Sequence, residues 1–330
     1  MRTLLRAPLP LFALSFATAA LMAFGACSSS GNDTDGPSGE AGGHATSTSG
    51  STSTSGTTST SSTGSTGSGG SGGSAPSCPP GPGGFGGNAA ALAVSPISVT
   101  VHDTSDKAVS GLLVFLCGTD LCSDPLHTSA AGTASTNKAW TEKKPAVKFG
   151  DALTYPELGV AITTAAPTFT TLVTAPFPAD GAVLAKGTKA TSGDVTLTLD
   201  AAAQVVINTL VYDEPDKQKF RSVTLPADKE AQVLANSPGL DLLYGVAPTQ
   251  TQICPSAAVT IPNDKGWTAG ASVDFYIQSL DVGEGFSPYA GWARISGGTV
   301  SADGKTITTN PGEGFPVIET FGVRLTPLTP

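Results

Sequence analysis

Residues 28–77 set the strongest limit on what this chain can fold into. They hold 17 Ser, 10 Thr and 13 Gly, and no large apolar side chain occurs among them. Such a segment cannot bury enough apolar surface to offset the entropy lost on ordering, so we expect it to stay disordered. We extend this tether over residues 27–93, because Pro and Gly crowd the stretch that follows Cys78. The folded part is therefore expected within residues 94–330.

The segment before the tether has the layout of a bacterial export signal. Two arginines precede an uncharged run at residues 9–26, and a Gly-Ala pair stands just before Cys27. This layout resembles a bacterial lipoprotein signal, with Phe24 where that family usually has Leu. The resemblance implies a signal peptide at 1–26, cleavage before Cys27 and lipid on that cysteine. Two alternatives stay open: ordinary cleavage after Gly25, and an uncleaved helix, since the run is at the lower edge of spanning length.

The charge of the chain limits its partners. The formal net charge is −9, and loss of the two signal arginines would leave −11. An acidic chain without a Lys/Arg run argues against nucleic acid and against an anionic membrane surface. The membrane is then a partner only through the N-terminal lipid. Ser28, not Asp, follows Cys27, which by resemblance to lipoproteins points to the outer membrane, on its periplasmic or its surface face.

The cysteines predict disulfide bonds. If Cys27 carries lipid, an even number of four remains in an exported chain: Cys78, Cys117, Cys122 and Cys254. Four cysteines allow three pairings. Cys117 and Cys122 are close enough to close a small loop, which would leave Cys78 for Cys254. Zinc-like spacing is missing and the chain has only three histidines, so no metal and no cofactor are expected.

The folded part is expected to be all-β. Charged residues make up 13%, well below the roughly 25% of an average domain. Apolar and polar residues alternate at 97–102 and 272–279, and Asp303-Gly304 between two alternating runs predicts a hairpin. Short strands separated by Pro, Gly and Asp turns predict two β-sandwich-like domains, at 94–200 and 201–330. Further strands are expected at 109–117, 152–155, 158–163, 169–174, 195–199, 204–212, 223–225, 242–246, 258–263, 291–295, 299–301, 306–308 and 321–325.

Three short segments, 99–103, 109–114 and 128–134, resemble the carboxypeptidase regulatory-like (transthyretin-like) module. In that family a strand leads to a second strand that opens with a small residue, Gly and a hydrophobic residue, and a turn precedes the third. Ser129 stands where the family has Asp. The resemblance covers roughly residues 95 to 200. It implies a seven-stranded, non-catalytic sandwich that serves in adhesion, in display or as an accessory domain.

The sequence reveals no catalytic constellation. The folded part lacks a Gly-x-Ser-x-Gly elbow, and its only histidines are His102 and His127. A histidine at a strand end, as at His102, more commonly has a surface or capping role. Asp281, Glu284 and Glu313 would suit Ca²⁺ if their loops converged, but isolated carboxylates on turns are usually just solvated. We therefore expect no enzyme and no metal site.

The candidate contact surface is an aromatic loop with Phe286, Tyr289 and Trp292. Tyr and Trp on a Gly/Pro loop can stack on sugar rings or anchor a protein partner. The alternative, which we favour for Tyr289 and Trp292, is that they fill the core of the second domain. The sequence thus predicts a non-catalytic, lipid-anchored envelope protein for binding, adhesion or structure, with a carbohydrate or envelope-protein partner. The alternative is a secreted or envelope polysaccharide hydrolase whose site the sequence does not reveal.

Overall fold

The computed structural model describes residues 78–327, except 86, 88, 152 and 281–284. The expected signal peptide, Cys27 and the tether up to residue 77 lie outside these described residues. Within them the chain is all-β, as predicted, and contains no α-helix. The first strand begins at Ala91, slightly before the expected start of the folded part.

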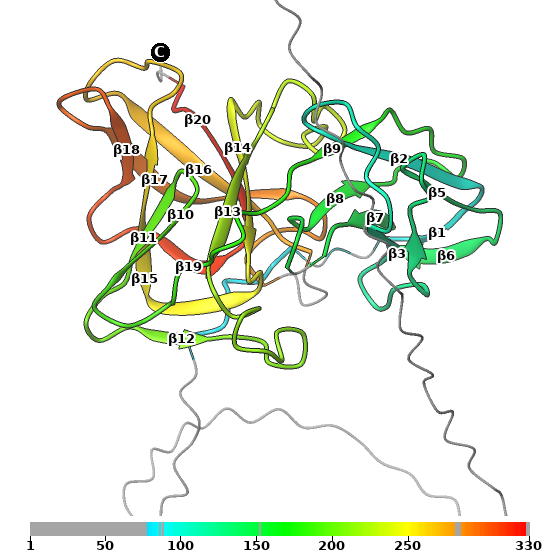
Figure 1. Ribbon diagram of the computed structural model, residues 1–330, viewed down its shortest axis with the longest axis horizontal. Helices are drawn as coiled ribbons and strands as arrows, with labels where there is room; N and C mark the ends of the chain where they lie inside the picture. Colours follow the sequence, from blue (N-terminus) through cyan, green and yellow to red (C-terminus); the bar gives the residue numbers. More distant parts are fainter. Residues whose placement is uncertain (1–77, 86, 88, 152, 281–284, 328–330) are drawn as a thin grey trace, which may run out of the picture. The chain divides into compact units, whose positions relative to one another are not determined.

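The strands before residue 175 form three small sheets (Figure 1). A two-stranded sheet pairs β1 (Ala91–Val94) with β6 (Trp140–Lys143). A three-stranded sheet has the order β5 (Thr133–Thr136), β2 (Ile97–Asp103), β9 (Leu172–Thr174), with β2 and β9 parallel. A four-stranded sheet has the order β4 (Leu126–His127), β3 (Leu113–Cys117), β7 (Ala146–Phe149), β8 (Leu158–Ala161).

The three-stranded and four-stranded sheets bury their apolar sides in one shared core. The alternation along β2 directs Ile97, Val99 and Val101 inward, as the sequence predicts for a half-buried strand. Val114 and Phe149 reach the same core from the other sheet. The core also takes in residues from far along the chain: Leu225, Val233, Leu240, Leu243, Tyr276 and Trp292.

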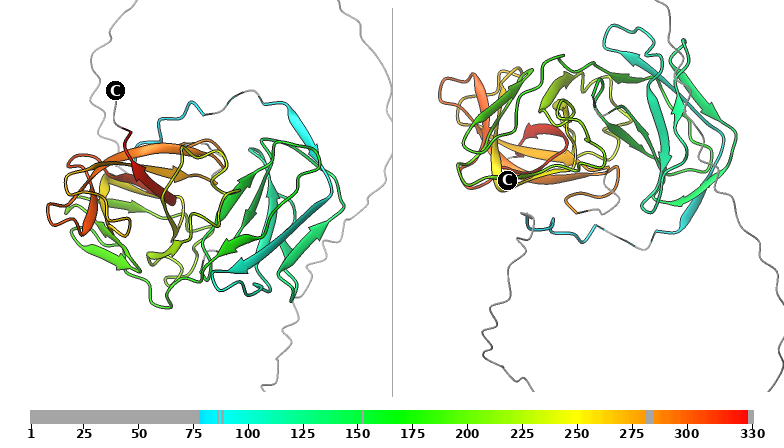
Figure 2. Two further views of the ribbon diagram at one scale, coloured as in Figure 1. Left: turned by 90° about the horizontal axis from the view of Figure 1, so that it is seen from above. Right: turned by 60° about the horizontal axis from the view of Figure 1, so that its bottom comes forward.

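The remaining strands build one large sheet that curls on itself (Figure 2). Its main path runs β10 (Lys189–Ser192), β11 (Val195–Thr198), β15 (Thr251–Pro262), β18 (Thr306–Thr309), β17 (Trp292–Val300), β16 (Ser272–Gln278), β20 (Thr320–Leu325), β14 (Leu242–Ala247), β13 (Arg221–Leu225). Two further strands, β12 (Gln204–Val206) and β19 (Phe315–Ile318), pair with the first half of β15. The strands after residue 175 thus form one nearly closed sheet.

Side-chain hydrogen bonds join the two ends of this sheet. The Ser222 amide in β13 donates to Ser192 Oγ at 3.1 Å, and Ser222 Oγ donates to the Ser192 carbonyl. Thr224 Oγ1 donates to Asp194 Oδ2 at 2.8 Å. Gly193 has a φ of +50°, and a Cβ there would lie 2.6 Å from the Ser222 carbonyl oxygen. Only glycine therefore lets the β10–β11 turn come this close to β13.

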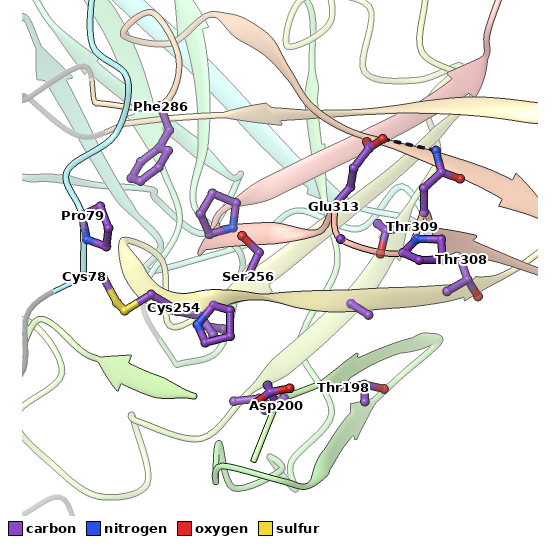
Figure 3. A pocket seen from close by; sticks show the side chains of 18 of the residues that line it. Cys78, Pro79, Thr198, Asp200, Cys254, Ser256, Phe286, Thr308, Thr309 and Glu313 are labelled. Carbon is purple, nitrogen blue, oxygen red and sulfur yellow. Dashed lines mark hydrogen bonds between the residues drawn. A yellow bond between two sulfur atoms is a disulfide. The ribbon is translucent and has the colours of Figure 1, made fainter. Parts of the chain in front are cut away.

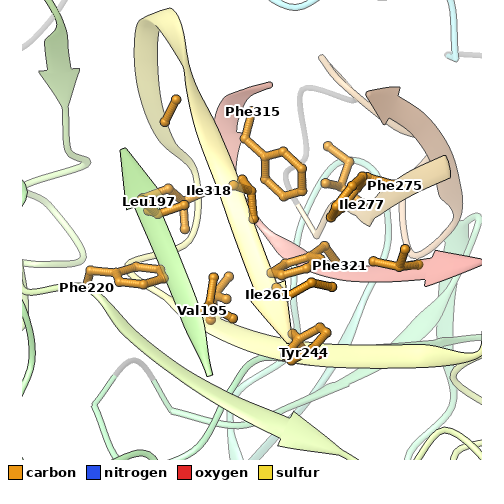
Figure 4. Close-up of a cluster of buried hydrophobic side chains, with 14 of the residues drawn as sticks. Val195, Leu197, Phe220, Tyr244, Ile261, Phe275, Ile277, Phe315, Ile318 and Phe321 are labelled. Atoms are coloured by element: carbon orange, nitrogen blue, oxygen red, sulfur yellow. The ribbon is translucent and has the colours of Figure 1, made fainter. Parts of the chain in front are cut away.

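The inside of the large sheet is filled by apolar side chains (Figure 4). Phe315 and Phe321 meet edge to face, with ring centroids 5.1 Å apart, and Tyr244 stacks on Phe321 at 4.9 Å. Val195 and Leu197 enter the same core from β11. The strand β11 pairs with β15, and β10 pairs with β11. The large sheet therefore already includes residues before 200, where the sequence placed the limit between the two domains.

Several expected strands are shorter or missing. The strands expected at 109–117 and 169–174 begin only at 113 and 172, and the one expected at 158–163 ends at 161. Within the segment expected to form a strand at 152–155, residues 153–155 form a bend, because Asp151 Oδ1 accepts the backbone amides of Leu153, Thr154 and Tyr155. A side chain that captures three successive amides removes them from any strand ladder. The expected strand at 204–212 ends at Val206, and Asn208 Oδ1 accepts the Leu210 amide in the turn that follows.

Gln278, the last residue of β16, covers the free edge of β8. Its Oε1 accepts the Gly159 amide and its Nε2 donates to the Gly159 carbonyl, both at 3.0 Å. Gln278 is 1% exposed. One buried side-chain amide thus replaces a neighbouring strand and ties the four-stranded sheet to the large sheet.

We predict that Gln278→Ala lowers the free energy of unfolding by about 3 kcal/mol, because it leaves two buried backbone groups unpaired. Gln232→Ala is the matched control. Gln232 makes the same pair of bonds, from the Thr170 amide and to the Thr168 carbonyl, but at the surface. That control should lose about 1 kcal/mol or less. Urea unfolding of the two variants measures both losses, and equal losses would contradict the role given to Gln278.

Glu230 is a buried carboxyl group in the connection between β13 and β14. It is 1% exposed, and within the described residues no hydrogen bond of good geometry reaches either oxygen. Burial raises its pKa from 4.5 to about 8, opposed only by the nearby Val173 amide. The group is therefore largely protonated at neutral pH. The same connection accepts a hydrogen bond from Trp292 in β17, whose Nε1 donates to the Val233 carbonyl at 3.1 Å.

The Glu230 pKa predicts a stability that falls with rising pH. The folded chain holds this proton more tightly than the unfolded chain, so the contribution is complete below pH 4.5 and is lost as the pH rises towards 8. The loss amounts to at most about 5 kcal/mol. Glu230→Gln carries no proton to lose, so its stability should change less between pH 5 and pH 9. Urea unfolding at both pH values tests this, and identical changes in variant and parent would refute it.

Candidate functional site

An open groove of about 1100 Å³ lies beside the Cys78–Cys254 disulfide (Figure 3). We call it the disulfide groove. Its floor is the outward side of β15, where Cys254, Ser256 and Ala258 point away from the core. Its volume lies slightly above the range of about 300–1000 Å³ that is typical of ligand sites.

The alternation of β15 explains why this strand can serve both the core and the groove. Ile253, Ala257 and Val259 are fully buried, whereas the residues between them are half-buried or exposed. The pairing of β15 with β19 changes register between Gln252 and Ala257, so a bulge lies under the groove. Bulges bend a strand and re-aim its side chains, and they are common next to sites.

The walls of the groove are rich in rigid apolar rings. Among the described residues, the groove lining has one aromatic residue, Phe286. Six prolines also line the groove: Pro79, Pro80, Pro82, Pro255, Pro311 and Pro316. A proline lacks a backbone N–H and has a fixed φ, so these walls offer CH surface on a stiff frame.

The segment that begins at Cys78 is fixed to the fold at several points. The disulfide to Cys254 holds its start, with the two Cα atoms 5.5 Å apart. The Gly83 amide donates to the Gly285 carbonyl at 3.0 Å, and Lys144 Nζ donates to the Phe85 carbonyl at 2.8 Å. The groove wall formed by this segment is therefore part of the folded structure.

Polar groups line the rest of the groove. Thr198, Thr308 and Asn310 contribute hydroxyl and amide groups, and Asp200 and Glu313 contribute carboxylates. No Lys, Arg or His occurs among the described residues that line it. This part of the lining therefore offers many hydrogen-bond acceptors and no positive charge.

Glu313 is held in its ionised form. Its Oε2 accepts the Gly297 amide, and Asn310 Nδ2 donates to its Oε1 at 3.4 Å. The hydrogen bond from the Gly297 backbone is the main reason why the pKa of Glu313 lies below its ordinary value. A carboxylate that is stabilised in this way accepts hydrogen bonds at neutral pH and has no proton to donate.

Burial distinguishes the three residues of the candidate aromatic contact surface. Phe286 lines the groove, but Tyr289 is 4% exposed and Trp292 is 9% exposed, and both pack in the interior. The loop folds back because Ser287 Oγ accepts the Ser279 amide at 2.7 Å. Of the three aromatic residues, only Phe286 is available to a partner.

Of the residues proposed for a metal or catalytic site, Glu313 lines the groove, and the two histidines of the folded part do not. Cys27, Asp281 and Glu284 lie outside the described residues, so a calcium site with Glu313 stays a prediction that is not tested. Among the residues that are described, no cluster of three or more His, Cys, Asp or Glu could hold a metal ion. His102 lies in β2 and His127 in β4, away from the groove lining. The described part of the chain has no helix of the length and apolarity needed to cross a bilayer.

A second polar cluster lies buried between the small and large sheets. Lys148 Nζ is 3.1 Å from Glu157 Oε1, and Thr249 Oγ1 donates to Glu157 Oε2 at 3.0 Å. Tyr212 bonds Thr249 at 2.7 Å, and burial, followed by the charge of Glu157, raises the Tyr212 pKa. None of these residues lines the groove. Because the chain itself supplies these hydrogen-bond and ion-pair partners, this cluster is a structural link.

The groove residues Thr198, Asp200, Thr308 and Asn310 were missed by reasoning from the sequence. The alternation in 195–199 and 306–308 predicts which side chains point outward, but not that β11 and β18 flank the same strand. The bond between Cys78 and Cys254 is the signal that could have located the groove, because it brings the end of the tether to β15.

Comparison with protein-family models, with curated proteins and with solved structures finds no match for this chain. The resemblances to a lipoprotein signal and to the carboxypeptidase regulatory-like module therefore stay predictions.

The two disulfides should contribute unequally to stability. Cys78 and Cys254 are 176 residues apart, whereas Cys117 and Cys122 are 5 apart. In the chain-entropy model the long loop is worth about 5 kcal/mol and the short loop about 2 kcal/mol. We predict that Cys78→Ala/Cys254→Ala lowers the urea midpoint more than Cys117→Ala/Cys122→Ala. An equal or larger loss from the short loop would overturn this ranking.

Proposed function

We propose that the chain is an exported, non-catalytic binding module, held in the cell envelope by lipid on Cys27. The disulfide groove is the observation that carries the binding role. It combines apolar rings, hydroxyls and carboxylates on a stiff frame, which is the composition of a recognition site. The two disulfides support export, because such bonds persist in oxidising compartments.

The chemistry of the groove favours binding over hydrolysis. A glycosidase needs one carboxyl group that donates a proton and a second that acts as base or nucleophile. Among the described residues, Asp200 and Glu313 are the carboxylates that line the groove, and Figure 3 places them on different sides of the β15 ribbon. The lowered pKa of Glu313 removes it as a proton donor at neutral pH. Glu313 therefore does not supply the acid that the hydrolase alternative needs.

The anchor has a direct test. We predict that Cys27→Ala moves the protein from the membrane fraction to the soluble envelope fraction of a host that lipidates exported proteins. Cys117→Ala/Cys122→Ala is the control, because it also removes cysteines but leaves Cys27. Blotting of both fractions for a tag at the C-terminus gives the readout. Retention of the Cys27→Ala protein in the membrane fraction would contradict the lipid anchor.

A further inference from the structure

We propose that the disulfide groove and a row of hydroxyls beside it bind a single chain of a neutral polysaccharide. This inference rests on the proposed binding function and gives that function a ligand class.

The groove matches the two faces of a sugar ring. A sugar presents a CH face, which packs on Phe286 and the proline rings, and an edge of hydroxyls that need hydrogen-bond acceptors. Asp200, Glu313 and Asn310 supply such acceptors. The two carboxylates disfavour phosphorylated, sulfated or uronate polymers, because no Lys or Arg occurs among the described residues that line the groove and exposed Lys189, the cross-strand partner of Thr198, lies outside the lining.

A row of hydroxyls continues from the groove across the large sheet. Its six residues share one register on six neighbouring strands: Thr191, Thr196, Thr260, Thr308, Thr299 and Ser272. Each is exposed or half-buried, whereas the strand residues next to them are buried. Thr308 belongs both to this row and to the lining of the groove, so the two surfaces are continuous.

Hydrogen bonds between neighbours fix the orientation of the row. Thr191 and Thr196 join through their Oγ1 atoms at 2.9 Å, and Thr260 and Thr308 do the same at 3.1 Å. Thr299 Oγ1 donates to Asn310 Oδ1 at 2.9 Å, which links the row to a second groove residue. These hydroxyls are thus ordered before any ligand binds.

The spacing and curvature of the row select a single flexible chain. Neighbouring strands lie about 4.8 Å apart, so six hydroxyls span about 24 Å and recur once per sugar unit of an extended chain. Each strand is rotated by about 20° from the last, so the row turns through about 100°. A flat crystalline surface cannot follow this turn, whereas a soluble polymer chain can.

A protein partner is the less suitable occupant. The backbone groups of β11, β15 and β18 are already paired on both sides near the row, so these three strands offer no free edge to an added strand. The outward neighbours of the row on these strands are uncharged and small: Thr198, Ala258, Pro262 and Thr306. Such a surface lacks the large apolar anchors that protein interfaces use.

Affinity electrophoresis of the purified full chain tests the inference. The probes are three soluble neutral polymers, dextran, laminarin and hydroxyethylcellulose, and the anionic polymer alginate. We expect at least one neutral polymer to retard the protein and alginate to have no effect. Thr260→Val/Thr308→Val removes two hydroxyls but keeps the side-chain shape, so binding should weaken about tenfold. Phe286→Ala should also weaken binding.

Thr100→Val/Thr133→Val is the matched control. Thr100 and Thr133 form the same hydroxyl pair at 3.1 Å on β2 and β5, away from the groove. This control should bind like the parent, and thermal unfolding checks that all variants fold. No retardation by any neutral polymer, retardation by alginate, or an unchanged affinity of Thr260→Val/Thr308→Val would each overturn the inference.

The same samples separate this inference from the proposed function. New reducing ends in a retarding polymer would show hydrolysis, and would overturn the non-catalytic role while sugar recognition stood. If the Cys27→Ala variant leaves the membrane fraction but no polymer retards the purified full chain, the envelope role would stand and the sugar ligand would be refuted.

Discussion

Strand β15 organises the second half of the molecule through one constraint, the alternation of its side chains. It pairs with four strands, β11, β12, β18 and β19, so a change in its register would displace all of them. Its inward residues fill the large core, and its outward residues form the floor of the groove. The position of the groove is thus a consequence of core packing, because every outward residue is fixed once its inward neighbour is buried.

The predicted all-β class and many individual strands agree with the structure for a local reason. In 97–102 and 272–279 the apolar residues alternate, and each strand occurs because its own sequence has the right period. The strand that pairs with each of them cannot be predicted from this local pattern. Residues 195–198 form the expected strand, but β11 joins β15, which begins more than fifty residues later. Pairing over such a distance depends on the whole core, and a local pattern carries no information about it.

The errors at single sites also have physical causes. At 152–155 the apolar content suggested a strand, but one carboxylate captured the amides and made a bend. Tyr289 and Trp292 were favoured as core residues of the second domain, and both are buried, but Trp292 packs in the core of the small sheets and not in that of the large sheet. The cysteines left three pairings open, and the structure contains Cys117–Cys122 and Cys78–Cys254. The Cys78–Cys254 bond locates the groove, because it joins the segment at Cys78 to β15, and no local sequence pattern indicates that these two segments are neighbours.

The Cys78–Cys254 bond also determines how a mechanical force would enter the fold. Tension applied through the N-terminal segment reaches Cys78 and passes across the disulfide into β15 at Cys254. The residues between these two cysteines form a covalent loop of the chain and are bypassed by this load path. The small sheets, which lie within that loop, are thereby shielded from a pull that an anchored protein would experience. The same bond lies in the wall of the groove, so a pull on the N-terminus and a drag on a bound chain would meet at one point.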